Sequence, residues 1–226
     1  MNNTFYSEIE TAFTVSRLSV YKQDGADDLT CLARYLYNIE VCKSLYSSLN
    51  IFEVTFRNAI DKILCMVADS DNWYDILPLD STSLKNISDA KHKIQKKGKM
   101  VTHDRIVSEL TFGFWTSLLT PRYSQAVFQS KIIKTCFKTI PAAQRNIKYL
   151  QARFDKIRVL RNRVSHYERI IHWKDLATQH AELLESIKWL DNASYELACS
   201  CDKFPKIYGK AFKTCMKYVK KHWNRY

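Results

Sequence analysis

The spacing of apolar residues predicts helices along most of the chain. Within residues 29–67, apolar side chains recur every three or four positions and form one stripe: Leu45, Leu49, Phe52, Phe56, Ile60, Ile63 and Val67. We expect a joint in this segment near residues 47–50. On another face, Glu53, Arg57 and Asp61 are four residues apart, which is the spacing of an ion-pair ladder.

The same pattern divides the rest of the chain into further helices. We expect an amphipathic helix within residues 5–19 and a basic helix over residues 84–97, with residues 70–83 as a loop that Trp73 anchors as a buried aromatic. Further helices are expected from a Thr102 cap to just before Pro121, over 123–138, from Pro141 to 167, and over 173–198, followed by a basic tail from 203. The pattern predicts about eight helices and no strand.

Composition favours an all-α fold. The 226 residues contain only 4 glycines and 4 prolines, too few for the many special turns of sandwiches and barrels, while 46% hydrophobic residues can supply a sizeable core. We expect three segments: an N-terminal helix and linker over residues 1–28, a main helical domain over 29–200, and a basic C-terminal helix or tail over 201–226.

The charge balance favours a polyanionic partner. Lys and Arg total 35 against 23 Asp and Glu, which gives a formal charge of +12. Candidate contacts to an RNA backbone are Lys91, Lys93, Lys96, Lys97 and Lys99, and in the tail Lys213, Lys217, Lys220 and Lys221. The alternative for both groups is a solvated helix face. The tail could also lie on an anionic membrane, but its aromatic residues are scattered.

The cysteines and most histidines show no metal-ligand spacing. The seven cysteines form no CxxC pair, and Cys199 and Cys201 are too close together for a zinc knuckle, so we interpret the cysteines as core fillers in a reducing compartment. Five histidines have no ligand spacing: His92, His103, His172, His180 and His222. We expect no metal and no cofactor. With no signal peptide and no apolar stretch of membrane-spanning length, we expect no membrane association and a cytoplasmic location.

One short stretch, VLRNRVSHYERI over residues 159–170, concentrates polar chemistry. On a helical wheel, a core stripe contains Ile157, Leu160, Val164 and Ile171, with Tyr167 at its edge. A polar fan occupies the opposite face and contains Arg161, Asn162, Ser165, His166 and Arg169. Arg163 falls outside this fan. The plain alternative is a solvated helix face.

The residue types in the fan suit phosphodiester cleavage without a metal. An imidazole can give and take protons near neutral pH, and a guanidinium can hold a phosphate by two bonds and neutralise developing charge. An amide can orient either partner. The sequence has no cluster of Asp and Glu suited to holding two magnesium ions, which disfavours a metal-dependent nuclease.

The segment from Arg161 to His166 matches the R-N-x-x-x-H motif of HEPN (higher eukaryote and prokaryote nucleotide-binding) ribonucleases. Together with SLNIFEVTFRNAIDKI, ELTFGFWTSLLTPRY and RVLRNRVSHYERI at similar spacing, residues 29–172 resemble the Abi-like proteins of the abortive-infection D/F group. Many of these relatives have a second histidine where this chain has Tyr167, so that position is given no role.

The resemblance implies an HEPN-like helical bundle, with additional helices at both ends of this chain. It also implies a homodimer that cleaves RNA without a metal and acts as a toxin or antiphage effector. The site would lie where the motif helices of two protomers approach. A site on the helix face opposite the core of its own protomer needs a second protein surface to enclose it. Relatives suggest restraint by an antitoxin or a small structured noncoding RNA.

In such a site, His166 serves as general base or acid, Arg161 stabilises the transition state and Asn162 orients the phosphate or the arginine. Ser165 and Arg169 would support them. Arg57 and Asn58, within the signature FRNAI, either support the site or belong to the ion-pair ladder.

Other interpretations stay open at this point. Phe112, Phe114 and Trp115 could stack on bases, although core packing is the plainer expectation. The chain could be a non-catalytic RNA-binding module within a ribonucleoprotein complex. It could also be a helical scaffold or a DNA-binding regulator, but no helix-turn-helix with a short glycine turn is recognisable.

Overall fold

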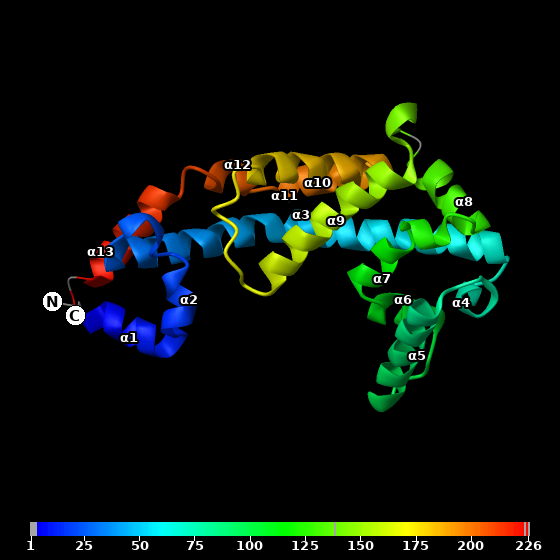
Figure 1. Ribbon diagram of the computed structural model, residues 1–226, viewed down its shortest axis with the longest axis horizontal. Helices are drawn as coiled ribbons and strands as arrows, with labels where there is room; N and C mark the ends of the chain where they lie inside the picture. Colours follow the sequence, from blue (N-terminus) through cyan, green and yellow to red (C-terminus); the bar gives the residue numbers. More distant parts are fainter. Residues whose placement is uncertain (1–3, 138, 224, 226) are drawn as a thin grey trace. The chain divides into compact units, whose positions relative to one another are not determined.

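The computed structural model describes residues 4–137, 139–223 and 225, and every regular element in these ranges is a helix (Figure 1). The all-α prediction is therefore confirmed. The described residues exclude 1–3, Lys138, Asn224 and Tyr226. Parts of the predicted terminal segments and of the helix predicted over 123–138 fall on these excluded residues. Among the helices of the described part, none is long and apolar enough to cross a membrane.

The chain divides into two compact units. Unit 1 comprises residues 1–48, 160–181 and 200–226, and unit 2 comprises residues 49–159 and 182–199. Four helices of the described residues run through both units: α3 (Asp28–Ala68), α9 (Ile147–Ser165), α10 (Leu176–Leu190) and α11 (Asn192–Cys201). The predicted terminal segments 1–28 and 201–226 both fall in unit 1, and the predicted division into three segments stays a prediction.

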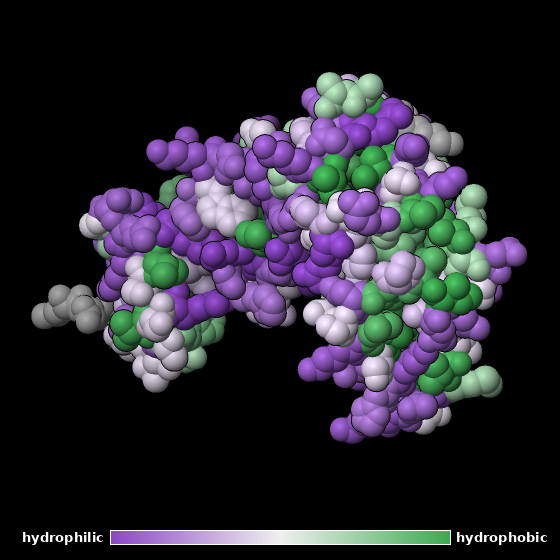
Figure 2. Space-filling model, turned by 45° about the vertical axis from the view of Figure 1, so that its right-hand side comes forward, coloured by the Kyte–Doolittle hydropathy of each residue, from purple (hydrophilic) through white to green (hydrophobic). Residues whose placement is uncertain are grey.

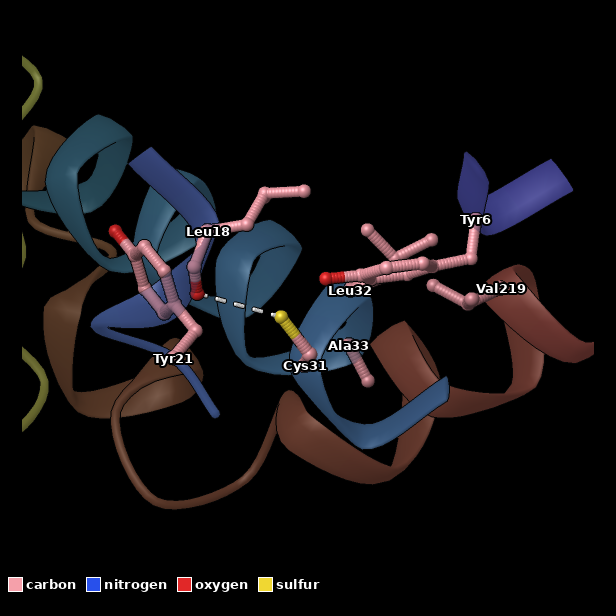
Figure 3. Close-up of a cluster of buried hydrophobic side chains, with 7 residues drawn as sticks. All are labelled: Tyr6, Leu18, Tyr21, Cys31, Leu32, Ala33 and Val219. Atoms are coloured by element: carbon pink, nitrogen blue, oxygen red, sulfur yellow. Dashed lines mark hydrogen bonds between the residues drawn. The ribbon is translucent and has the colours of Figure 1, made fainter. Parts of the chain in front are cut away.

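Unit 1 joins the two ends of the chain. It holds α1 (Thr4–Phe13), α2 (Val15–Ser19), η1 (Gln23–Gly25), α12 (Phe204–Ile207) and α13 (Phe212–Trp223), together with the first half of α3. Its apolar cluster is formed by Tyr6, Leu18, Tyr21, Cys31, Leu32, Ala33 and Val219 (Figure 3). In this cluster, Tyr6 of α1 and Val219 of α13 meet Leu32 of α3. Within the basic tail, α13 is therefore a packed helix.

Unit 2 is built on an aromatic core. It holds α4 (Trp73–Ile76), α5 (Ser81–Lys96), α6 (His103–Glu109), α7 (Phe112–Ser117), η2 (Pro121–Tyr123), α8 (Val127–Cys136), η3 (Ala142–Gln144) and most of α11 (Asn192–Cys201). The Phe154 ring lies 4.8–5.7 Å, between centroids, from Phe52, Phe56 and Phe137. Such aromatic pairs add stability beyond the area they bury.

Two predictions about unit 2 are confirmed by burial. Trp73 is fully buried as expected of an anchor, and Phe112, Phe114 and Trp115 are core residues. These three side chains are therefore not available to stack on bases.

On the face shown in Figure 2, apolar residues over unit 2 are interrupted by hydrophilic ones. Exposed apolar side chains in such a mixture are normal and need no partner.

Several helix boundaries differ from the prediction. The expected joint near residues 47–50 is wrong: α3 continues through it, because the apolar stripe is unbroken and the helix contains neither glycine nor proline. The structure has two helices where one was expected over 102–120, and again two where one was expected over 173–198. In each case, a side chain inside the segment caps the start of the second helix. Thr111 accepts a hydrogen bond from Phe114 N at 3.3 Å, and Asp191 accepts one from Ser194 N at 2.7 Å.

Candidate functional site: the C-terminal turn of α9

The helix that carries the motif ends earlier than the wheel assumed. α9 stops at Ser165, and Tyr167 adopts a left-handed conformation with φ 59°. Glu168 N then donates to Arg163 O at 2.9 Å, which closes the last turn in the way that helix C-termini commonly do. The prediction that residues 166–171 continue the helix is wrong. His166 is thus the first residue beyond α9, and its amide donates to Asn162 O at 2.9 Å.

The buried stripe of the wheel is confirmed as far as the helix extends. Ile157, Leu160 and Val164 are buried, whereas Tyr167 is 74% exposed and does not lie at the edge of a buried stripe. Ser165 and His166 are exposed, and Arg161 and Asn162 are half-buried. The three proposed catalytic side chains therefore lie off the core, on the last turn of α9 and the residue after it.

Arg169 does not belong to the polar fan. Its Nη1 donates to the backbone oxygen of Val20 and, at 2.5 Å, to Oε1 of Gln23. Burial, with Arg34 nearby, lowers the pKa of Arg169. The predicted supporting role for Arg169 was based on a helix that does not reach it. The observed contacts hold the loop after α9 against the segment between α2 and α3.

Arg163, which the wheel placed outside the fan, also ties down this loop. Its Nη1 lies 2.6 Å from Oε2 of Glu168, and its guanidinium lies 5.9 Å from the centre of the Trp173 ring. From α2, Arg17 donates to the backbone oxygen of Tyr167. Several basic side chains near the motif therefore serve to fix the backbone, in contrast to His166, whose side chain is exposed.

Asn38 of α3 holds the same loop from its buried side, and the sequence analysis missed it. Its Nδ2 donates to Glu168 O at 3.1 Å, and its Oδ1 accepts from Ile170 N at 2.8 Å and from Ile171 N at 3.3 Å. Asn38 is 3% exposed. The available signal was its position seven residues before Leu45, on the apolar stripe, because a buried amide requires hydrogen-bond partners.

Two hollows in unit 1 flank the turn after α9. An apolar hollow of about 470 Å³ is lined by Tyr35, Ile39, Cys42, Tyr46, Val164 and Tyr167, among others. A polar one of about 570 Å³ includes Arg17, Arg163, Glu168, Arg169 and His172. Burial, followed by the charges of Arg169 and Arg163, lowers the pKa of His172. Neither hollow is lined by Arg161, Asn162 or His166.

The predicted supporting pair Arg57 and Asn58 lies in unit 2. Arg57 Nε donates to Asn58 Oδ1 at 3.3 Å, and Asn58 is exposed. Asp61, expected to extend an ion-pair ladder with Arg57, has its carboxylate 3.1 Å from His103 Nε2 and accepts a hydrogen bond from Trp73 at 2.8 Å. A role for Arg57 and Asn58 in the site stays a prediction.

The two groups of lysines differ in their surroundings. In α5 and the turn after it, Lys91 pairs with Asp75 at 3.0 Å and Lys97 pairs with Glu109 at 2.9 Å, while Lys93 lies 4.0 Å from Glu109. Lys93, Lys97 and Lys99 together lower the pKa of Glu109, the bond from Lys97 having the largest effect. Lys96 and Lys99 are exposed. The charge of this group is therefore partly balanced by its own unit.

The lysines of α13 form one exposed face. Lys213, Lys217, Lys220 and Lys221 are all exposed and, at 100° per residue, fall within an arc of about 100°. Cys215 and Val219 are buried on the opposite side. This face is the more concentrated basic surface of the two.

A group of possible metal ligands also lies in unit 2, where the sequence analysis expected none. Asp61, Cys65 and His103 bring a carboxylate oxygen, a sulfur and an imidazole nitrogen within 4.8 Å of one another. The spacing of Asp61 and Cys65 by four residues was the only signal in the sequence, since the position of His103 depends on the fold.

Comparison of the chain with protein-family models, curated proteins and solved structures finds no match.

Proposed function

We propose that this protein is a metal-independent endoribonuclease of the HEPN type, acting as an abortive-infection or toxin-type effector. The observation that carries the proposal is the position of Arg161, Asn162 and His166 on the last turn of α9 and directly after it, off the buried stripe. Their order in the sequence resembles the motif of that family. These side chains supply a proton carrier, a cation and an amide, which suffice for transfer at phosphorus without a metal.

In the proposed reaction, the 2′-hydroxyl of RNA attacks the adjacent phosphorus, and the bond from phosphorus to the 5′-oxygen breaks. His166 accepts the proton of the 2′-hydroxyl or donates one to the leaving oxygen. Arg161 neutralises the charge that develops on the phosphate oxygens, and Asn162 orients the phosphate. The products are a 2′,3′-cyclic phosphate and a 5′-hydroxyl. DNA lacks the attacking hydroxyl and is not a substrate.

The second wall of the site is proposed to come from a second copy of the chain. The three side chains lie outside the two hollows that flank the turn, and His166 is exposed. Tyr46 and Tyr167 line the apolar hollow beside the same turn and are 67% and 74% exposed, which suits burial in a two-fold contact. A two-fold axis at this surface would bring the two His166 side chains together.

The test compares the wild-type protein with His166→Ala and Arg161→Ala on total RNA in the presence of EDTA. Loss of a general acid or base should slow cleavage by about 10²- to 10⁴-fold. Stability should change by less than about 0.5 kcal/mol for the exposed His166, which circular dichroism during thermal unfolding would check. Arg163→Ala is the comparison variant, because Arg163 contacts Glu168 and Trp173 and is expected to affect cleavage less.

Two outcomes would overturn the proposal. Equal cleavage by wild type and His166→Ala would assign the activity to another group or to a contaminant. RNA binding without any cleavage by the wild type would instead favour a non-catalytic RNA-binding module. Light scattering at micromolar concentration tests the dimer separately, and a monomer alone would remove the proposed second wall.

A further inference from the structure

The end of α3 brings two possible ligands onto one helix face. Asp61 and Cys65 are one turn apart, and α3 ends three residues later at Ala68. Asp69 has a φ of 49°, and Ser70 N donates to Cys65 O at 3.1 Å, so the chain turns back immediately. This return places the Trp73 indole on Asp61, with Nε1 donating to Oδ1 at 2.8 Å.

A third possible ligand comes from α6. His103 is the first residue of that helix, and its Nε2 lies 3.1 Å from Oδ2 of Asp61. The side chains of His103 and Asp61 are 19% and 17% exposed. The ring of Tyr74 stacks on His103 with a centroid distance of 6.2 Å and an angle of 15° between the planes. The imidazole is thus held in a fixed orientation beside the carboxylate.

The three ligand atoms are close enough for one ion. They all lie within 4.8 Å of one another. Zinc bonds of about 2.0–2.3 Å in tetrahedral geometry place ligand atoms roughly 3.3–3.8 Å apart, so rotation of the Cys65 side chain and a shift of under about 1 Å would complete the site. The mixture of sulfur, nitrogen and oxygen suits zinc and disfavours calcium and magnesium, which take oxygen ligands.

The surroundings favour a cation at this position. The Cys65 side chain lies close to two carboxylates, those of Asp61 and Asp71. These two carboxylates attract a positive ion. Nε2 of His103 faces the same position, since it lies 3.1 Å from Oδ2 of Asp61.

We propose that Asp61, Cys65 and His103 bind one zinc ion, with Asp71 or a water molecule as the fourth ligand. The ion joins the last turns of α3 to the first turn of α6 and so stabilises unit 2. The indole of Trp73 holds the Asp61 carboxylate in place, as the outer hydrogen bonds of metal ligands do. The site is independent of the proposed ribonuclease function, because its ligands lie in unit 2 and the motif lies in unit 1.

The experiment uses the full chain without an affinity tag, stripped of metal by a chelator and titrated with cobalt(II) as a spectroscopic substitute for zinc. We expect saturation at one equivalent, with the near-ultraviolet charge-transfer band of a thiolate–cobalt bond and the visible bands of tetrahedral cobalt. Zinc should then displace the cobalt and abolish the visible bands. Trp73→Phe should weaken cobalt binding by about 10- to 100-fold, because it removes only the outer hydrogen bond.

The ligand variants provide the decisive comparison. Cys65→Ser should abolish the charge-transfer band, and His103→Gln should weaken binding more than Trp73→Phe does. The matched control is Cys199→Ser, which removes an exposed thiol of the same unit and should bind cobalt as the wild type does. Circular dichroism of each variant reports whether it is folded. Absence of the thiolate band in the folded wild type, or its persistence in Cys65→Ser, would overturn the proposal and leave a metal-free hydrogen-bonded cluster.

Discussion

Substitution of Asn38 by alanine should loosen the loop that follows α9. The Asn38 side chain makes three hydrogen bonds to the backbone of residues 168–171. At about 0.5–1.5 kcal/mol each, these bonds contribute roughly 1.5–4.5 kcal/mol. The bond to Ile171 is long at 3.3 Å, and Glu168 is half-buried so that water can replace part of its bond. We therefore expect a loss of about 2 kcal/mol.

Hydrogen exchange at the loop amides measures this loss where it arises. The Ile170 amide donates to Asn38 Oδ1 at 2.8 Å in the wild type, and Ile170 is fully buried. A loss of about 2 kcal/mol corresponds to roughly 30-fold faster exchange at this amide, since each 1.4 kcal/mol is a factor of about ten. Mass spectrometry of a peptide covering residues 166–172 reports the change without requiring the two units to unfold together.

The matched control is Asn50→Ala, the same substitution at an exposed position of the same helix. It should leave exchange in the loop unchanged and alter stability by less than about 0.5 kcal/mol. If Asn38→Ala exchanged at the wild-type rate in residues 166–172, the conclusion that this side chain holds the loop would be refuted.

Three further predictions concern stability and binding. Phe154→Ala removes a ring that packs on three other phenylalanines and should cost about 3–5 kcal/mol in urea unfolding followed by circular dichroism; a cost under about 1 kcal/mol would contradict the assigned core. Burial lowers the pKa of His180 from its ordinary value of 6.5, although Asp202 opposes the shift. As the pH drops below about 6.5, the unfolded chain binds a proton at this histidine that the folded chain does not, so stability should fall. His180→Gln should lose less stability between pH 7.5 and pH 5.5, and an equal loss would assign the effect elsewhere. The last variant replaces four exposed lysines of α13 by glutamine: Lys213, Lys217, Lys220 and Lys221. It should flatten the logarithmic salt dependence of RNA binding by up to about 3 units and leave the cleavage position unchanged. Unchanged affinity at low salt would show that this face is only solvated.

The fold class and much of the core could be predicted from local patterns. The apolar stripe of residues 45–67 and the scarcity of glycine and proline are properties of neighbouring residues, and they are sufficient to predict helices. Burial of Trp73 and Phe114 could likewise be predicted from their surroundings in the sequence. The joint expected near residues 47–50 was wrong because serine and asparagine were taken as a break, whereas Ser48 is buried within a continuous helix.

The parts that could not be predicted depend on contacts between distant segments. The end of α9 is fixed by a left-handed Tyr167, for which the sequence has no glycine signal. Arg169 appeared to be a site residue on the wheel, but its partners, Val20 and Gln23, lie almost 150 positions earlier in the chain. The cluster of Asp61, Cys65 and His103 is likewise assembled by the chain reversal after α3.

A similar non-local contact occurs at His180, to which the sequence analysis assigned nothing. Its Nε2 lies 3.0 Å from Oδ2 of Asp202, at ion-pair distance but poorly aligned for a hydrogen bond, and its ring stacks on Phe204 with centroids 4.3 Å apart. Asp202 and Phe204 lie more than twenty positions later in the chain. Spacing along the sequence, which was the criterion applied to the histidines, gives no indication of such partners.

In the proposed reaction, His166 directs the 2′-hydroxyl of RNA against the adjacent phosphate. This step is tested with a short RNA chosen for cleavage in the total-RNA assay and with the same strand carrying a single 2′-deoxy nucleotide on the 5′ side of the cleaved bond. Both are incubated in EDTA with the wild type and with His166→Ala. We expect a 2′,3′-cyclic phosphate product only from the all-RNA strand with the wild-type protein. Cleavage of the 2′-deoxy strand at the same bond and at a similar rate would contradict it.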